Sequence, residues 1–146
     1  MRGFTLLELL VVLVIVGLAT AGVALSLRDS EASALEREAM RLTTLLEAAR
    51  HHSRATGTAI HLQLRPLGFE LVAQWVAHPD NADLRGPKTW LSDGTFARMV
   101  EPPDNATWVL GPEPILPRQV LMLQRGSRQL VIGTDGFKPF AVQASP

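Results

Sequence analysis

The sequence contains no cysteine and no excess of charge of either sign, and each absence excludes a class of site. Without cysteine, the 146-residue chain has no disulfide, no thiolate metal site and no cysteine nucleophile. Lysine plus arginine and aspartate plus glutamate number 14 each. No overall electrostatic field therefore draws nucleic acid or acidic substrates to the whole surface. The domain must be held together by packing, and any charged recognition must be local.

Residue patterns typical of catalysis or cofactor binding are also missing. No glycine-rich phosphate loop follows a strand and opens a helix, and no serine lies in a nucleophile elbow. His51 and His52 are adjacent on a predicted helix, point about 100° apart, and cannot share one metal ion. The other two histidines are isolated, and turn chemistry explains the acidic residues that follow Pro79. We expect no enzymatic activity, no cofactor and no metal.

The longest uncharged run is Leu9–Leu27, with nineteen residues. As a helix it is about 28 Å long, close to the roughly 30 Å thickness of bilayer hydrocarbon. One interpretation is a secretory signal cleaved near Ala19-Thr20-Ala21, and a second is a signal anchor oriented by Arg2. Glu8 argues against the first, because a carboxylate at the entry of the run is penalised during insertion. The second leaves Glu8 without a role.

A third interpretation gives Glu8 a role. The residues Gly3-Phe4-Thr5-Leu6-Leu7-Glu8, followed by the apolar run, resemble the N-terminus of type IV pilins and pseudopilins. In that family a prepilin peptidase cuts after the glycine and N-methylates the new first residue, so the resemblance implies cleavage after Gly3 and methylation of Phe4. The new amine lies four residues from Glu8, at the edge of the hydrocarbon. We expect Glu8 to pair with the amine of a neighbouring subunit and to set the axial register of the assembly.

The resemblance also predicts how the chain is divided and where it resides. Residues 1–3 are a leader peptide, residues 4–27 a transmembrane and assembly helix, and residues 28–146 a periplasmic pseudopilin domain. The leader is shorter and less basic than is typical of the family, so either the true start lies upstream or processing relies on one arginine. We expect a single-pass protein of the bacterial inner membrane. Its expected partners are other pseudopilins, major and minor, the prepilin peptidase, and membrane lipid around the N-terminal helix.

A helical pattern continues beyond the uncharged run. After Arg28, small and large apolar residues recur at spacings of three and four, which predicts one buried stripe. No proline interrupts residues 1–65, and Gly57 occupies a position typical of a C-terminal cap. We therefore expect one helix from about Phe4 to Thr56, roughly 80 Å long. The stripe consists of Leu35, Ala39, Leu42, Leu46 and Ala49.

Beyond Gly57 the period changes to short apolar runs separated by glycine and proline, which predicts strands and turns. The expected fold class is α+β, with the long N-terminal helix packed on a C-terminal antiparallel β-sheet. We expect residues 77–105 to form a loop-like excursion anchored by Trp90, Leu91 and Phe96. The predicted strands are Thr58–Leu64 and Phe69–Val76 as a hairpin, then Thr107–Leu110, Val120–Leu123, Gln129–Ile132 and Phe140–Gln143.

A second resemblance extends past about the first 30 residues. The residues that carry it are Arg41-Leu42, Leu46, Ala49-Arg50, Gly57-Thr58-Ala59-Ile60 and the segment from Ile132 to Phe140. The chain is similar to the H-type minor pseudopilins of type II secretion and their pilus relatives, the GspH/FimT group. This resemblance implies a low-copy structural subunit near the tip of a periplasmic filament, which supports protein export through the outer membrane.

The alternative is a minor type IV pilin of the FimT kind in a pilus or DNA-uptake system. Residues 118–138 carry four basic side chains against Asp135 alone, a local charge of +3. If turns bring these together, the patch would contact DNA phosphates. The arginines lack interleaved aromatic residues and the whole chain is neutral, so we favour solvated hairpin charges and expect no nucleic-acid partner. The basic residues are Arg118, Arg125, Arg128 and Lys138.

Overall fold

A single helix forms the axis of the protein. The computed structural model describes residues 5–76, 78–102 and 107–143, with the side chains of residues 21–29 outside the description. Helix α1 (Leu6–Thr56) has 51 residues and is about 77 Å long. Gly57 ends it with a φ of 68°, the left-handed conformation that glycine adopts most readily. The predicted end at Thr56, with Gly57 as the cap, is confirmed.

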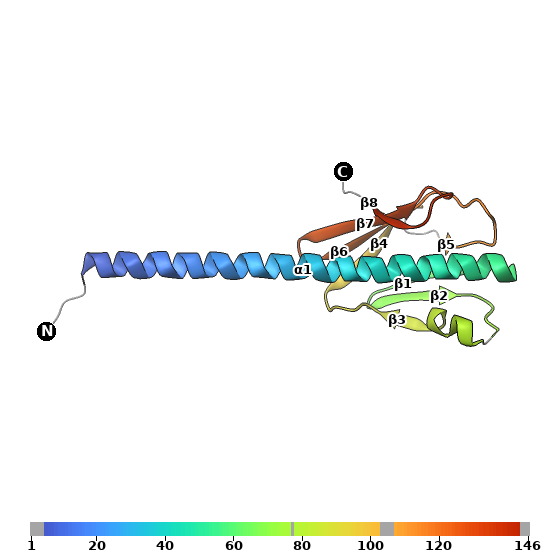
Figure 1. Cartoon of the computed structure of the whole chain (residues 1–146), viewed down its shortest axis with the longest axis horizontal. Coiled ribbons are helices and arrows are strands. Elements are labelled where there is room, and N and C mark those ends of the chain that lie inside the picture. Colours follow the sequence, from blue (N-terminus) through green and yellow to red (C-terminus); the bar gives the residue numbers. More distant parts are fainter. Residues whose placement is uncertain (1–4, 77, 103–106, 144–146) are drawn as a thin grey trace.

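The strands form two antiparallel sheets around the second half of α1 (Figure 1). Sheet 1 has the order β3-β2-β1-β5 and sheet 2 the order β4-β6-β7-β8. Figure 1 shows sheet 2 along one side of the helix and β1–β3 along the other. The predicted α+β class is confirmed, with the antiparallel strands divided between two sheets. The strands are β1 (His61–Arg65), β2 (Gly68–Val72), β3 (Pro87–Thr89), β4 (Thr95–Glu101), β5 (Trp108–Val109), β6 (Gln119–Arg125), β7 (Arg128–Thr134) and β8 (Ala141–Gln143).

The predicted apolar stripe of α1 is the centre of the core. All five of its side chains, from Leu35 to Ala49, are at most 1% exposed. Both sheets supply the residues of the same buried cluster, including Phe69 from β2 and Ile132 from β7. The second half of the helix lies between two sheets, so a single stripe with spacings of three and four residues packs against both of them. The stripe prediction is confirmed.

One glutamate–arginine pair on α1 attaches the helix to sheet 1. Glu38 is 1% exposed and forms an ion pair with Arg41 at 3.2 Å. Its carboxylate also accepts a hydrogen bond from the backbone N–H of Leu91 at 2.5 Å, and Arg41 donates to the carbonyl oxygen of Thr89 at 2.9 Å. Buried charges require partners of this kind. The pair fixes the chain at the end of β3.

A second pair, nine residues further along α1, attaches the helix to sheet 2. Glu47 accepts from the backbone N–H of Phe140 at 2.7 Å. Arg50, which is buried, donates to the carbonyl oxygens of Gly136 at 2.6 Å and Lys138 at 3.0 Å. The β7–β8 loop is therefore held by charged side chains of α1 through its backbone.

The largest error of the sequence prediction concerns residues 77–105. Instead of a loop-like excursion, the structure has a 3₁₀ helix, η1 (Pro79–Leu84), together with β3 and β4. Strand β4 lies at the edge of sheet 2, and only two of its seven residues, Thr95 and Met99, are buried. A strand so little buried shows no alternation of apolar residues, and this explains why the pattern did not predict it.

The predicted anchors of this segment are correct for one residue of three. Trp90 is buried and its ring lies 5.4 Å from that of Phe69. Leu91 and Phe96 are 56% and 53% exposed, so neither anchors the segment. Leu91 is held through its backbone N–H, and Phe96 points away from the core on edge strand β4.

Candidate functional site

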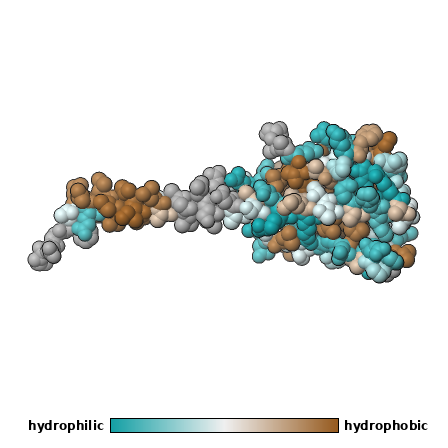
Figure 2. All heavy atoms as spheres, in the orientation of Figure 1, coloured by the Kyte–Doolittle hydropathy of each residue, from teal (hydrophilic) through white to brown (hydrophobic). Residues whose placement is uncertain are grey.

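The first part of α1, residues 6–18, presents an exposed apolar surface. Figure 1 shows it projecting beyond the strands, and Figure 2 shows apolar residues along it. Between Leu6 and Leu18 every large apolar side chain is exposed, from 44% at Val11 to 82% at Leu6. A contiguous apolar surface of this extent is typical of a protein interface or a membrane segment.

Parts of the predicted processing and membrane segments lie outside the described residues. Gly3 and Phe4, at which cleavage and methylation are predicted, fall in residues 1–4. The side chains of residues 21–29, which include the end of the predicted Leu9–Leu27 segment, are likewise outside the description. In the part of the chain that is described, no helix is both long enough and apolar enough to cross a membrane. The boundaries at residues 3 and 27 stay predictions.

Glu8 lies in the first turn of α1 and has a local role that the sequence analysis missed. Thr5 is the N-cap, and its hydroxyl accepts a hydrogen bond from the backbone N–H of Glu8 at 3.3 Å. A threonine followed three residues later by glutamate has the spacing of a capping box. The carboxylate also lies at the positive end of the helix dipole, which favours it by about 0.3–1 kcal/mol. The sequence signal for this capping role is the three-residue spacing between Thr5 and Glu8.

The Glu8 carboxylate remains available for a partner. Its side chain is exposed, and none of the ion pairs found among the described residues involves it. Its neighbours Leu7 and Leu9 are apolar and exposed. Contact of this surface with another apolar surface would remove the carboxylate from water, and it would then need a cation close by.

The four basic residues of the DNA hypothesis lie at two ends of the β6–β7 hairpin. Arg125 ends β6 and is directly opposite Arg128 in the register. Arg118 precedes β6 by one residue, about 24 Å from Arg125 at about 3.4 Å per residue. Lys138 lies in the β7–β8 loop, which leaves β7 at Thr134. The structure brings Arg125 and Arg128 together, and it does not gather all four residues into one patch.

Two of these residues also have acidic partners. Arg118 pairs with Glu101 at 3.0 Å, and Lys138 lies 3.8 Å from Asp135. Arg125 donates to the carbonyl oxygen of Asp93 at 2.7 Å. These contacts reduce the surface that Arg118, Lys138 and Arg125 present to an anion such as a phosphate.

Two of the four histidines, His52 and His78, have structural roles in the packing and capping of the fold. The ring of His52 lies 5.6 Å from that of Trp75, and the side chain of His78 caps η1 by accepting from the N–H of Asp80. Within the described residues, no group of three histidine, aspartate or glutamate side chains could hold a metal ion.

The similarity of this chain to a known protein family lies at its N-terminus. Residues 1–24 match a protein family described as the prokaryotic N-terminal methylation motif. No curated protein and no solved structure matches the chain. The matched part includes Gly3, Phe4 and Glu8, together with the start of the exposed apolar helix. The chain therefore carries the prepilin-type N-terminal signal of type IV pilin-like proteins, joined to an α+β domain of pilin-like arrangement.

Proposed function

We propose that the protein is a minor pseudopilin of a type II secretion system, a structural subunit at or near the tip of a periplasmic pseudopilus that supports protein export. The observation that carries the assembly role is the exposed apolar surface of residues 6–18 of α1, with a carboxylate at its start. The prepilin-type signal over residues 1–24 supports processing by a prepilin peptidase and assembly with other pilin-like subunits. The assignment to secretion and to the tip rests on the resemblance to H-type minor pseudopilins.

The proposed life cycle begins with a precursor in the bacterial inner membrane. The peptidase cuts between Gly3 and Phe4 and methylates the Phe4 amine, while Leu9–Leu27 crosses the lipid and residues 28–146 lie in the periplasm. On leaving the lipid, the apolar helix packs against the same helix of other subunits, which keeps its side chains away from water.

Register in the proposed filament comes from electrostatics. The Phe4 amine of one subunit pairs with the Glu8 carboxylate of its neighbour, since both groups would otherwise be unpaired in an apolar environment. Leaving one buried charge unpaired is destabilising by about 3–5 kcal/mol, so helices shifted along their axis are disfavoured. The Thr5 cap supports this pairing, because it fixes the helix start relative to the carboxylate.

A charge-removing variant tests the proposal. Glu8→Gln keeps the capping-box spacing, because glutamine also serves at this position, and it removes the negative charge. We expect cleavage after Gly3 to continue and incorporation into the filament to fall strongly, measured by cross-linking of subunits in cells. Glu36→Gln, an exposed carboxylate further along α1, is the matched control and should assemble normally. Normal assembly of Glu8→Gln would contradict the proposal.

The alternative, a minor type IV pilin of a pilus or DNA-uptake system, would have the same signal and a similar fold. Its DNA-binding form depends on Arg118, Arg125, Arg128 and Lys138 acting together. The separation of these residues along the hairpin favours the pseudopilin instead. A gel shift with the full chain at low salt tests the alternative, which predicts binding that weakens as salt is added and is lost in an Arg125→Gln, Arg128→Gln double variant.

A further inference from the structure

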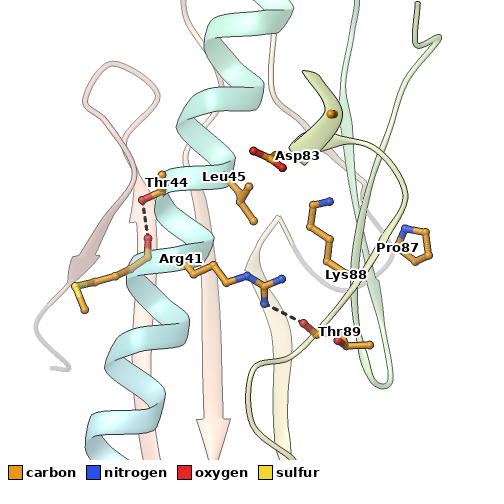
Figure 3. A pocket seen from close by; sticks show the side chains of 9 residues that line it. Arg41, Thr44, Leu45, Asp83, Pro87, Lys88 and Thr89 are labelled. Carbon is orange, nitrogen blue, oxygen red and sulfur yellow. Dashed lines mark hydrogen bonds between the residues drawn. The ribbon is translucent and has the colours of Figure 1, made fainter. Parts of the chain in front are cut away.

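A groove of about 690 Å³ lies between α1, η1 and β3. Figure 3 shows Arg41 from α1 and Lys88 from β3 extending into the same hollow, with Asp83 of η1 on its rim. Met40 and Leu45 of α1 supply apolar walls. The groove therefore combines cationic and apolar surface within reach of one bound segment.

The Lys88 ammonium group in this groove forms no ion pair with any acidic side chain that the structure describes. Its nitrogen donates to the carbonyl oxygen of Arg85 at 3.1 Å, which uses one of its three N–H donors. None of the ion pairs found in the described part of the chain involves it. Burial and the nearby Arg41 guanidinium lower the pKa of Lys88, although Asp83 and Glu70 act in the opposite direction. A carboxylate entering the groove would relieve this unfavourable environment.

Neither of the other two charged side chains that line the groove pairs with Lys88. Arg41 is held by Glu38 and by the carbonyl oxygen of Thr89, so it contributes a fixed positive charge beside Lys88. Asp83 is exposed and forms no ion pair with Lys88 within 4.0 Å. An incoming anion would therefore find the ammonium group accessible.

The apolar wall selects the kind of anion. Met40 is 59% exposed although it lies on the helix that forms the core, and methionine adapts its shape to different partners. A free inorganic anion would leave this wall uncovered. A peptide segment with a carboxylate next to an apolar side chain would cover it and pair with Lys88 as well.

The position of the groove distinguishes a peptide from a lipid headgroup. Arg41 lies 14 residues beyond Leu27, the end of the proposed membrane segment, or about 21 Å further along the helix. This is too far for a lipid phosphate to reach. The groove opens beside the same helix whose residues 6–18 present the apolar assembly surface, so a neighbouring subunit is the partner at hand.

We propose that this groove binds an acidic segment of a neighbouring pilin-like subunit, whose carboxylate pairs with Lys88 while an adjacent apolar side chain packs on Met40 and Leu45. The identity of the neighbour rests on the proposed function, whereas the binding chemistry belongs to the groove itself. In the proposed filament, this contact holds neighbouring subunits together in the periplasm, in addition to the proposed ion pair at Glu8.

The test uses the full chain in detergent micelles and a fluorescent peptide of alternating glutamate and leucine, with binding measured by anisotropy. The peptide is expected to bind, and Lys88→Glu to weaken it by at least about tenfold. Met40→Asp, a change at an exposed position, should weaken binding several-fold without affecting the fold. Arg98→Glu on the exposed side of β4 is the matched charge-reversal control and should bind normally.

Three results would overturn the inference. They are equal binding of a glutamine–leucine peptide, unchanged affinity in both Lys88→Glu and Met40→Asp, and displacement of the peptide by inorganic phosphate at an equal concentration. The last would identify a general anion site. Because the measurement uses unassembled subunits, its outcome does not depend on cleavage after Gly3 or on Glu8, and failure of either proposal leaves the other testable.

Discussion

The Glu47 carboxylate accepts a hydrogen bond from the backbone N–H of Phe140 at 2.7 Å, although the two residues are 93 positions apart in the chain. With Arg50 it joins α1 to the loop between β7 and β8. The Glu38–Arg41 pair does the same for the end of β3. In a filament subunit held by its N-terminal helix, these contacts would pass force from the helix to the domain.

Removal of the Arg50 guanidinium should destabilise the domain. Arg50→Met leaves the carbonyl oxygens of Gly136 and Lys138 without their charged donor, and hydrogen bonds of charged groups contribute about 1.5–3 kcal/mol. We expect a loss of about 3 kcal/mol in the free energy of unfolding by chemical denaturation of the full chain. Arg37→Met, at an exposed position of the same helix, is the control. Equal stabilities of the two variants would rule out the anchoring role.

Two nearly adjacent residues of α1 test whether the helix packs through its apolar stripe. Leu42 is fully buried, so Leu42→Ala should leave a cavity and lower the free energy of unfolding by about 2–5 kcal/mol. Met40→Ala, two residues earlier on an exposed face, should change it by less than about 0.5 kcal/mol. Denaturant unfolding of both variants measures the difference. Similar losses would mean that the helix does not pack through this stripe.

Two glycines with positive φ should respond differently to alanine. Gly57 has open space where a Cβ would lie, so Gly57→Ala should cost only about 1 kcal/mol for the left-handed backbone. At Gly136, with a φ of 97°, a Cβ would lie 1.9 Å from the carbonyl oxygen of Leu116. Gly136→Ala must displace backbone and should therefore lower the melting temperature considerably more. A smaller effect at Gly136 would contradict the close approach of these two loops.

The turn at Asp135 should be sensitive to acid. Hydrogen bonds from the backbone N–H groups of Lys138 and Phe137 lower the pKa of the Asp135 carboxyl below its ordinary value of 3.8. A depressed folded-state pKa means that this stabilisation is complete above the unfolded-state value and is lost as the pH falls through the folded-state value. NMR amide shifts of Phe137 and Lys138 should move in that acidic window, and in Asp135→Asn the movement should disappear. A transition at or above 3.8 would contradict the assigned hydrogen bonds.

The features that local sequence determines were predictable. The end of α1 followed from Gly57, which tolerates the left-handed conformation that ends the helix, and the stripe from Leu35 to Ala49 followed from helical spacing. The division into two sheets was not predicted, because it depends on pairings such as that of β1 with β5, residues that are distant in the chain. Strand β4 was missed because so few of its residues are buried.

The candidate site also combines features that the sequence predicts with features that depend on tertiary packing. The importance of Glu8 was evident from its position before an uncharged run, and the family match over residues 1–24 agrees with that interpretation. The Thr5 cap was readable from its spacing and was overlooked. The groove beside Lys88 could not be predicted, because η1 and β3 meet α1 only through tertiary packing.

Processing of the chain as a prepilin would expose a cationic amine four residues before Glu8, and the proposed assembly depends on this amine. Mass spectrometry of the intact protein and its N-terminal peptide, isolated from cells with an active prepilin peptidase, would identify the first residue and its modification. We expect a chain that begins at Phe4 and carries one additional methyl group on its amine. A polypeptide that begins at Met1, or at a residue beyond Ala21, would contradict it.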